Sequence, residues 1–294
     1  MVLRPRHTRF VELFRTTPPK TVCPNFYVLS HANGCAFQPH CEYCYLKSSL
    51  WHLGGSHVFT NTARMIREIR AWIRRDGLET NVLNMGNLSD SLVFEPVRPL
   101  IRELVELFRT EAEAHGRPHS ILLVTKGGVR TCAPLLASSP CANVIVSFSL
   151  NNPIAARRHE TGAASVSDRL AAARRLRDEG WRVRIRLDPM IKGFSYDGVA
   201  RKVRALRPER VTLGSLRAEP NLSRCAPSML FEHLDPAPDS KSLARYPFAE
   251  RLAMYRSVTN VLRNICPIGL CEESAEMWDA LGLDKDARSC NCGG

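Results

Sequence analysis

Residues 34–46 read Gly34-Cys35-Ala36-Phe37-Gln38-Pro39-His40-Cys41-Glu42-Tyr43-Cys44-Tyr45-Leu46, which places three thiols on one short segment with the spacing C-x5-C-x2-C. The segment follows the apolar run 26–29, which has the composition of a buried strand. Three closely spaced thiolates can bind three irons of a 4Fe-4S cluster and leave the fourth iron open, as catalytic metal sites require. Zinc is the alternative, but a zinc site needs a fourth Cys or His, and His40 is poorly placed beside Cys41. The spacing therefore favours a cluster at Cys35, Cys41 and Cys44.

The composition is that of a globular protein. The 294 residues are 44% hydrophobic and 24% charged, enough for one large α/β domain or two small ones. No apolar run approaches the roughly 20 residues of a membrane span, and residues 1–7 lack the apolar core of a signal peptide. Eleven cysteines without an export signal favour metal ligation in a reducing compartment. We therefore expect a cytoplasmic protein with no membrane contact.

The charge is strongly basic. Lys and Arg number 41 against 29 Asp and Glu, a formal net charge of +12, which favours phosphate-rich partners. The basic residues are spread along the chain without a basic tail, so charge alone supports nucleic-acid binding only weakly.

Strand-like runs alternate with amphipathic helical runs. The predicted strands are 26–29, 80–85, 120–125, 143–148, 182–187 and 210–213. The predicted helices are 60–75, 96–115, 129–137, 166–179, 196–206 and 248–263, with Ser165 as a cap for the fourth. Six βα units predict a parallel sheet with right-handed crossovers, which we expect to form a partial (β/α)6 TIM-like barrel. Chemistry then belongs at the carboxyl ends of the strands, where the cysteine segment also lies.

One predicted strand, residues 182–188, alternates arginine with apolar residues. Its apolar residues should face the helices, so Arg182, Arg184 and Arg186 should project into the barrel interior. Buried guanidinium groups are costly unless they meet anions. We interpret Arg184 and Arg186 as a wall that binds a carboxylate or phosphate of cofactor or substrate. Ion pairs with Asp188 and Glu160, or exposure at the rim, are the alternative.

Several separate stretches resemble the spore photoproduct lyase family of radical S-adenosylmethionine (SAM) enzymes, over about residues 25–215. They are Cys41-Glu42-Tyr43-Cys44-Tyr45-Leu46, Leu88-Ser89-Asp90-Ser91-Leu92, Leu123-Val124-Thr125-Lys126, Phe148-Ser149-Leu150-Asn151, His159-Glu160-Thr161-Gly162 and Asp168-Arg169-Leu170-Ala171-Ala172-Ala173-Arg174. The resemblance implies a partial barrel, a SAM-binding 4Fe-4S cluster and reductive cleavage of SAM to a 5′-deoxyadenosyl radical that abstracts hydrogen. Because the founding activity reverses a thymine–thymine lesion in DNA, it also implies a nucleobase or nucleotide substrate and an electron donor such as flavodoxin or ferredoxin.

The resemblance also implies roles for single residues. The cluster ligands are Cys35, Cys41 and Cys44; Tyr43 lies against the adenine side of SAM, and Tyr43 and Tyr45 resemble a radical relay. The positions that match strand ends around SAM are Ser89, Asp90, Lys126, Ser149 and Asn151, to which we add Arg184 and Arg186 as cofactor-binding candidates. Each has a structural alternative, such as a turn-capping Ser89 or a solvated Lys126.

The chain departs from the family pattern in two places. The family's first cysteine gap is three residues, and here it is five. The lesion-repairing enzymes also carry a cysteine two residues before the Ser-Asp pair, as hydrogen donor to the product radical, and here that position is Asn87. An amide N–H bond is too strong to replace a thiol. The resemblance therefore implies a relative with another substrate or quenching step, for which Cys225 is a candidate donor.

Beyond residue 215 the chain is rich in Pro and Ser, as in a loop that covers the barrel mouth. Cys266, Cys271, Cys290 and Cys292 follow, spaced C-x4-C-x18-C-x-C, with a predicted helix at 272–283 between the pairs. They suit a second 4Fe-4S cluster or a zinc ion, or else simple packing residues and a loose tail. Cys23, Cys132, Cys141 and Cys225 show no partner pattern.

Together these features predict an amino-terminal extension (1–24), a barrel (25–215) and a carboxyl-terminal cysteine-containing extension (216–294). The function we expect is a lyase-like radical SAM enzyme acting on a nucleobase or nucleotide. The alternatives are a radical SAM enzyme for a small anionic metabolite or peptide, which would account for the inward arginines, and a non-catalytic metal-bearing nucleic-acid-binding protein.

Overall fold

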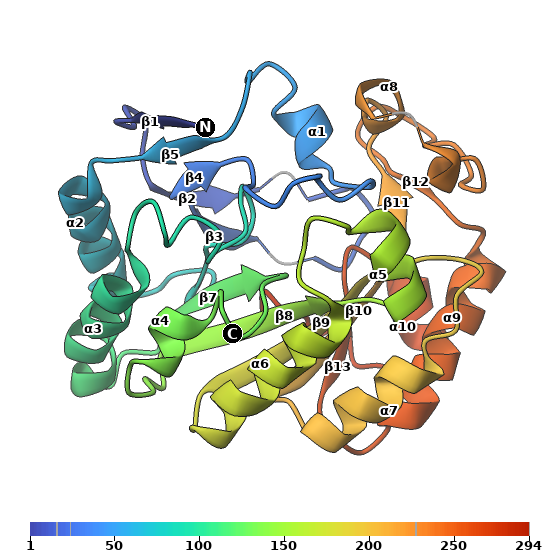
Figure 1. Ribbon diagram of the computed structural model, residues 1–294. Helices are drawn as coiled ribbons and strands as arrows, with labels where there is room; N and C mark the ends of the chain where they lie inside the picture. Colours follow the sequence, from blue (N-terminus) through green and yellow to red (C-terminus); the bar gives the residue numbers. More distant parts are fainter. Residues whose placement is uncertain (16, 24, 227, 294) are drawn as a thin grey trace.

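A computed structural model describes residues 1–15, 17–23, 25–226 and 228–293. Its centre is an open eight-stranded sheet with the order β13-β10-β9-β8-β7-β6-β3-β2 (Figure 1). The strands are β2 (Val11–Phe14), β3 (Phe26–Leu29), β6 (Val82–Asn84), β7 (Ser120–Thr125), β8 (Val144–Leu150), β9 (Arg182–Met190), β10 (Arg210–Ser215) and β13 (Ile268–Leu270). All are parallel except β2, which pairs antiparallel with β3. The six predicted strands are confirmed in their predicted order, and over the described ranges the sheet does not close into a barrel.

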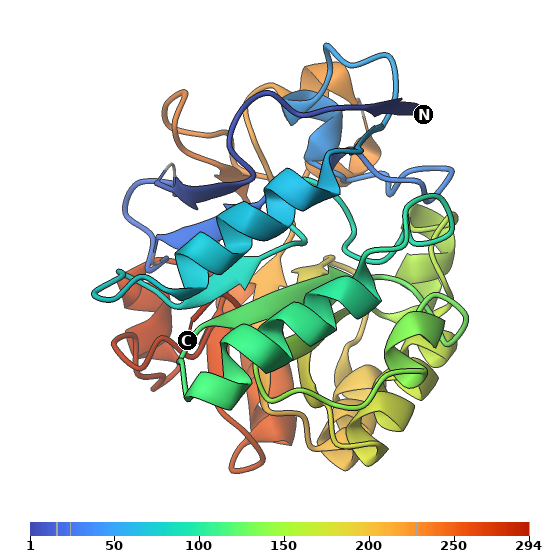
Figure 2. The same ribbon diagram turned by 90° about the vertical axis from the view of Figure 1, so that its left-hand side faces the viewer.

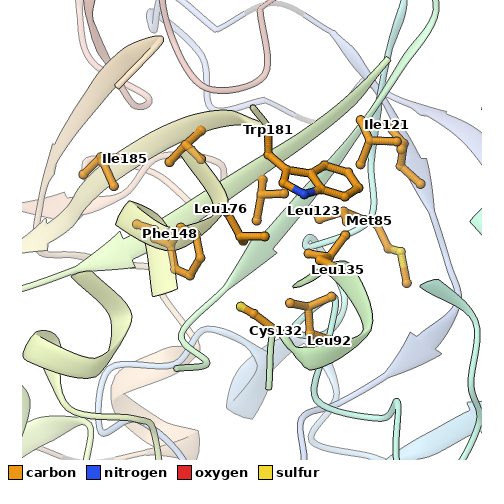
Figure 3. Packing of buried hydrophobic residues seen from close by; sticks show 14 of the residues in the cluster. Met85, Leu92, Ile121, Leu123, Cys132, Leu135, Phe148, Leu176, Trp181 and Ile185 are labelled. Atoms are coloured by element: carbon orange, nitrogen blue, oxygen red, sulfur yellow. The ribbon is translucent and has the colours of Figure 1, made fainter. Parts of the chain in front are cut away.

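Most of the helices lie along the outside of this curved sheet (Figures 1 and 2). The helices are α1 (Leu46–Ser49), α2 (Thr62–Ile73), α3 (Ile101–Glu111), α4 (Ala133–Leu136), α5 (Pro153–His159), α6 (Val166–Asp178), α7 (Asp197–Leu206), α8 (Leu222–Cys225), α9 (Phe248–Leu262) and α10 (Ala275–Ala280), with 3-10 turns η1 (Glu113–His115) and η2 (Met229–Phe231). Strands β7 and β8 are buried at every residue, as expected for parallel strands covered on both faces. Their helix-facing side chains and those of α4 and α6 form the core seen in Figure 3, which includes Leu123, Leu135, Phe148 and Leu176.

Local chemistry explains where the helices differ from the prediction. The helix predicted at 96–115 begins only at Ile101, because Pro99 disfavours a helical conformation at the residue before it. The carboxylate of Glu95 accepts hydrogen bonds from the amides of Leu100 (2.9 Å) and Ile101 (3.0 Å) and so fixes that start. The predicted cap of α6 is confirmed, since the Ser165 hydroxyl accepts from the Asp168 amide at 3.2 Å.

The two predicted extensions are parts of the central sheet. Strand β2 comes from residues 1–24 and strand β13 from residues 216–294, and they form its two edges. The backbone N–H of Val22 donates to the carbonyl of Glu273 at 2.7 Å, so the segments beyond the two edges meet. A small sheet of β1 (Val2–Arg4), β5 (His57–Phe59) and β4 (Ala32–Asn33) and a hairpin of β11 (Arg217–Ala218) and β12 (Ala244–Arg245) complete the fold. None of the helices described is both long enough and apolar enough for a membrane crossing.

Candidate active site

The cysteine segment crosses the carboxyl ends of the parallel strands. It begins at Gly34, whose φ of +94° lies in the left-handed region that favours glycine, and whose amide donates to Leu88 beyond β6 at 2.9 Å. Farther along, the amide of Glu42 donates at 2.9 Å to the carbonyl of His159, the last residue of α5. A Cβ at Gly162 would lie 2.3 Å from the carbonyl oxygen of Pro39, so glycine is needed for this close approach. The segment is therefore tied to the loop after β6 and to the end of α5.

The three thiols of this segment are half-buried. Burial, together with the negative charges of Asp90, Cys44 and Cys41, raises the pKa of Cys35 to about 12. Burial also raises the pKa of Cys41 and of Cys44, opposed in each case by the positive charge of Lys126. Three neighbouring thiols beside a cation suit a cluster that binds them as thiolates.

Across the described residues, no group of three or more His, Cys, Asp or Glu side chains is gathered closely enough to hold a metal ion. This finding gives no support to zinc at either set of cysteines. An iron–sulfur cubane spaces its cysteines more widely than a single ion does, because each thiolate binds a different iron.

Next to the cysteines lies a buried network centred on Glu160, whose side chain is 1% exposed. The hydroxyl of Tyr43 donates to Glu160. Lys126 Nζ lies 3.3 Å from Glu160 Oε1 and 3.2 Å from Tyr43 Oη, and Asn151 Nδ2 lies 3.1 Å from the same carboxylate oxygen. Arg169 Nη1 pairs with Glu160 Oε2 at 2.6 Å. Burial alone would raise the pKa of Glu160, but Lys126 and Arg169, with the two hydrogen bonds, lower it to about 2.

The network joins three of the predicted cofactor-binding residues, Tyr43, Lys126 and Asn151. Lys126 follows β7 and Asn151 follows β8, so both come from the strand ends where sites of such sheets form. Lys126 is no solvated loop lysine: its side chain is 18% exposed and its Nζ lies 5.2 Å from the centre of the Tyr43 ring. Burial lowers the pKa of Lys126, but the charges of Glu160 and Cys41, together with the hydrogen bond to Glu160, outweigh this and raise it, so the ammonium is retained.

The other predicted strand-end residues do not join the network directly but form hydrogen bonds that position its members. Asp90 Oδ2 accepts from the Lys126 amide at 2.8 Å and Asp90 Oδ1 from the Thr125 hydroxyl at 3.0 Å, which fixes the backbone that carries Lys126. Ser89 is buried and its hydroxyl donates to the Asp90 carbonyl at 3.1 Å. The carbonyl of Ser149 accepts from Arg169 at 2.9 Å.

Three members of the network were not among the predicted site residues: Glu160, Arg169 and Tyr196. The Tyr196 hydroxyl donates to Asn151 Oδ1 at 2.6 Å. Glu160 and Arg169 lie in stretches that carry the family resemblance, which was the available signal. Glu160 was expected only as an alternative partner of the β9 arginines, and it pairs instead with Lys126 and Arg169.

The alternation of β9 is confirmed, because its apolar residues lie in the main core. Arg184 has no exposed side-chain surface, and its Nη1 donates to the carbonyls of Asn291 (2.6 Å) and Gly293 (3.0 Å). Arg186 pairs with Asp188, as the alternative held, and the half-exposed Arg182 pairs with Glu209 at 2.7 Å. Their guanidinium groups meet partners within the chain, but the buried Nε atoms of Arg184 and Arg186 have none among the described residues, so the anion-binding role of these two residues stays a prediction.

Tyr45 and Asn87 lie together, since the Tyr45 hydroxyl donates to the backbone carbonyl of Asn87. The position where the lesion-repairing enzymes place a cysteine is thus beside Tyr45, for which the resemblance predicts a relay role. Cys225 is exposed on α8, whereas Cys132 and Cys141 are buried in the main core as simple packing residues.

A cavity of about 510 Å³ adjoins the network between α5, α6 and α7. Its lining includes Glu160, the hydroxyl-bearing Thr161 and Ser165, and the basic Arg157 and Lys202. Both basic residues are exposed, so the outer rim of the cavity is positively charged. This arrangement can receive an anionic group next to the Glu160 network.

The model of the spore photoproduct lyase family matches residues 7–207. The chain belongs to this family. Solved structures of spore photoproduct lyase agree in fold. A mutant enzyme superposes with a TM-score of 0.73 at 16% identity over 93% of this chain and 82% of its own. A double mutant with bound AdoMet and dinucleoside spore photoproduct gives 0.70 at 17% identity, over 93% and 82%. Streptococcus suis SuiB bound to S-adenosylmethionine gives 0.52 at 12%, over 89% and 54%. No curated protein matches the chain in sequence.

Proposed function

We propose that this member of the spore photoproduct lyase family is a radical SAM enzyme that abstracts a hydrogen atom from a nucleobase or nucleotide substrate. Cys35, Cys41 and Cys44 would hold a 4Fe-4S cluster, which supplies the electron that cleaves SAM to methionine and a 5′-deoxyadenosyl radical. The observation that carries the proposal is the Glu160 network, which ties Tyr43, adjacent to Cys44, to the ends of β7 and β8. We interpret β3 and β6–β10 as the partial (β/α)6 barrel of this enzyme class.

In this proposal the chain's own residues bind and orient the cofactor. Glu160 and Lys126 fix the ring of Tyr43, which offers a flat surface to the adenine of SAM. Asn151 is held by Tyr196 so that its amide donates to Glu160. Leu216 and Tyr246 exclude water from this side, because they pack in one buried cluster with Tyr43.

The substrate class rests on the family and on charge. Solved spore photoproduct lyases hold a dinucleoside spore photoproduct, and this chain carries a net charge of +12. With Asn87 beside Tyr45, we propose a lyase-like reaction that ends without a cysteine at that position, in the cytoplasm, with flavodoxin or ferredoxin as the electron donor. The alternative substrate, a small anionic metabolite or peptide, has less support, since Arg184 and Arg186 each have a partner within the chain.

The test is anaerobic reconstitution with iron and sulfide, reduction with dithionite, and measurement of 5′-deoxyadenosine formed from SAM. We expect wild type to form the nucleoside and the Cys35→Ala/Cys41→Ala/Cys44→Ala variant to lose it. Adding a thymine-containing dinucleoside photoproduct or oligonucleotide should raise the wild-type rate. Iron without SAM cleavage in wild type would overturn the enzyme assignment, and SAM cleavage indifferent to every nucleotide would overturn the substrate class.

A further inference from the structure

The carboxyl-terminal cysteines lie where the two ends of the sheet meet. Cys271 directly follows β13, and its amide donates to the Leu213 carbonyl of β10 at 2.8 Å. Two residues farther on, the carbonyl of Glu273 accepts a hydrogen bond from the amide of Val22 at 2.7 Å. Cys23 directly follows Val22 in the chain. This backbone bond brings the segment that carries Cys23 alongside the segment that carries Cys271.

The tail of the chain lies against the same part of β13. A Cβ at Gly269 would lie 2.4 Å from the backbone nitrogen of Cys290, and the Ser289 hydroxyl donates to the Ile268 carbonyl at 2.9 Å. Gly269 and Cys271 share a face of β13, because side chains alternate along a strand, while Leu270 on the other face lies in the main core. The tail therefore covers the face that carries Cys271.

Polar side chains from three other strands fix the tail inside the curve of the sheet. Ser147 of β8 donates to Asn291 Oδ1 at 2.9 Å, Arg184 of β9 donates to the carbonyl of the same residue at 2.6 Å, and Asn84 of β6 donates to Cys292 Sγ at 3.5 Å. Cys290 is 7% exposed and Asn291 2%. The C-x-C segment is therefore buried and fixed in place by hydrogen bonds.

Cys266 does not belong to this group. It precedes β13 while Cys271 follows it, and the strand pairs with β10 along the whole interval. Five residues of extended chain span about 16 Å, too far for one cluster to bind both thiols. The C-x4-C spacing, read as a ligand pair in the sequence, places its two cysteines at opposite ends of a strand.

Hydrogen-bond donors surround the remaining thiols. Arg217 Nη2 lies 3.2 Å and Arg186 Nη2 3.6 Å from Cys271 Sγ. Beside the tail, Arg184 Nε and Asn291 Nδ2 are buried and have no partner in the part of the chain that the structure describes. Iron–sulfur clusters are anionic and accept N–H donors at their sulfurs.

We propose that Cys23, Cys271, Cys290 and Cys292 bind a second 4Fe-4S cluster where the segments next to the two edges of the sheet meet. The site uses an amino-terminal cysteine that shows no partner pattern in the sequence and excludes Cys266. It ties residues before β3, residues after β13 and the tail into one unit. Its residues are distinct from those of the proposed SAM cluster.

The test uses the full-length Cys35→Ala/Cys41→Ala/Cys44→Ala variant as background, so that only the second site can bind iron. After anaerobic reconstitution we expect about four irons and four sulfides per chain, with the electron paramagnetic resonance signal of a reduced 4Fe-4S cluster. In this background, Cys271→Ala and Cys292→Ala should each lower the iron content at least twofold and change the signal. The matched control, Cys266→Ala, should leave both unchanged.

The outcomes separate this proposal from the proposed function, which is tested by SAM cleavage in wild type. A background variant that binds no iron, or that binds one zinc in its place, overturns the second cluster. Iron that is lost with Cys266→Ala but kept with Cys23→Ala overturns the ligand set. Cys271→Ser and thermal unfolding of the iron-free proteins check that iron loss does not come from misfolding, since a folded variant without iron supports the assignment.

Discussion

Glu160 is the residue on which the buried cations of the site depend. Its single carboxylate faces both Lys126 and Arg169. The Lys126 side chain is only 18% exposed and the Arg169 side chain 0%, so water cannot take the place of the carboxylate as a partner of either cation. Removing one partner of a buried ion pair costs about 3–5 kcal/mol, because the remaining charge is left uncompensated. Glu160 therefore both positions Tyr43 and stabilises the fold around it.

We expect Glu160→Gln to destabilise the protein by about 3 kcal/mol at pH 7, with a lower urea midpoint and little change in slope. The effect should depend on pH with a definite sign. The folded pKa of Glu160 is lowered to about 2, so its contribution is fully present above the unfolded pKa of about 4.3 and is lost as the pH falls through the folded value.

The difference between wild type and Glu160→Gln in urea unfolding should therefore shrink between pH 5 and pH 2. Asp168→Asn is the control, because this carboxyl lies on α6 next to Arg169 but takes no part in the network. A difference that stays constant with pH would contradict the role given to the Glu160 charge.

At the scale of elements, the sequence predicts the strands that are buried on both faces and misses the two edge strands. Runs such as Ser120–Thr125 are apolar throughout because helices and the interior cover both sides, and their bounds agree with the prediction. The edge strands β2 and β13 are short and only partly buried, so neither gives a continuous apolar run. Their pairing follows from contacts distant in sequence.

The same limit applies to the site. Tyr43, Lys126 and Asn151 were predictable because each adjoins a strand end or a cysteine. Glu160 was missed because its role depends on a hydrogen bond from Tyr43, which is 117 residues away in sequence. Arg184 was read as a ligand-binding residue because its partner Asn291 lies 107 residues away, in a tail that carries no strand or helix signal. Polar side chains that point inward from β9 indicate that something binds to them in the interior of the sheet, but they do not identify it.

The group that Arg184 binds is the carboxyl-terminal tail, and this contact gives a prediction for β9. Arg184→Met keeps most of the side-chain volume but removes the donors to Asn291 and Gly293. The buried Asn291 carbonyl loses this donor at a cost of about 1–3 kcal/mol, whereas the Gly293 carbonyl keeps Arg210 at 3.1 Å. We expect carboxypeptidase to trim the tail at least several-fold faster than in wild type, followed by mass spectrometry. Arg182→Met on the same strand is the matched control, because its guanidinium is half-exposed and bonds Glu209 and Ala142 instead of the tail. Equal trimming of both variants would contradict the pinning role of Arg184.

At the scale of the whole molecule, the two ends of the chain complete the sheet that carries the site. The hydrogen bond between Val22 and Glu273 joins segments that a linear division would assign to separate extensions. Glu273, 1% exposed at the side chain, is in turn paired with Arg251 and accepts from Tyr255 at 2.7 Å. The predicted division at residues 24 and 215 therefore does not separate structural units, and truncation at either point would remove an edge strand.

The net charge of +12 gives the prediction that belongs to the molecule as a whole. If the substrate is part of a nucleic acid, binding releases counterions, and affinity falls with salt by a logarithmic slope of about −0.7 per phosphate contacted on a single strand. With about four contacts, affinity for a labelled thymine-rich oligonucleotide should fall roughly 50-fold between 50 and 200 mM salt, as measured by fluorescence anisotropy.

The cavity rim beside Glu160 should account for part of this slope, because Arg157 and Lys202 stand exposed at its edge. Arg157→Glu/Lys202→Glu should weaken binding at 50 mM salt about tenfold and make the salt slope shallower by about one. Arg67→Glu/Arg75→Glu changes the charge by the same amount at two exposed residues, Arg67 on α2 and Arg75 just after it, and should have a much smaller effect. In Figure 1, α2 lies across the sheet from α7. Equal losses in the two double variants would mean that the oligonucleotide responds only to overall charge, and the cavity rim would then have no part in substrate binding.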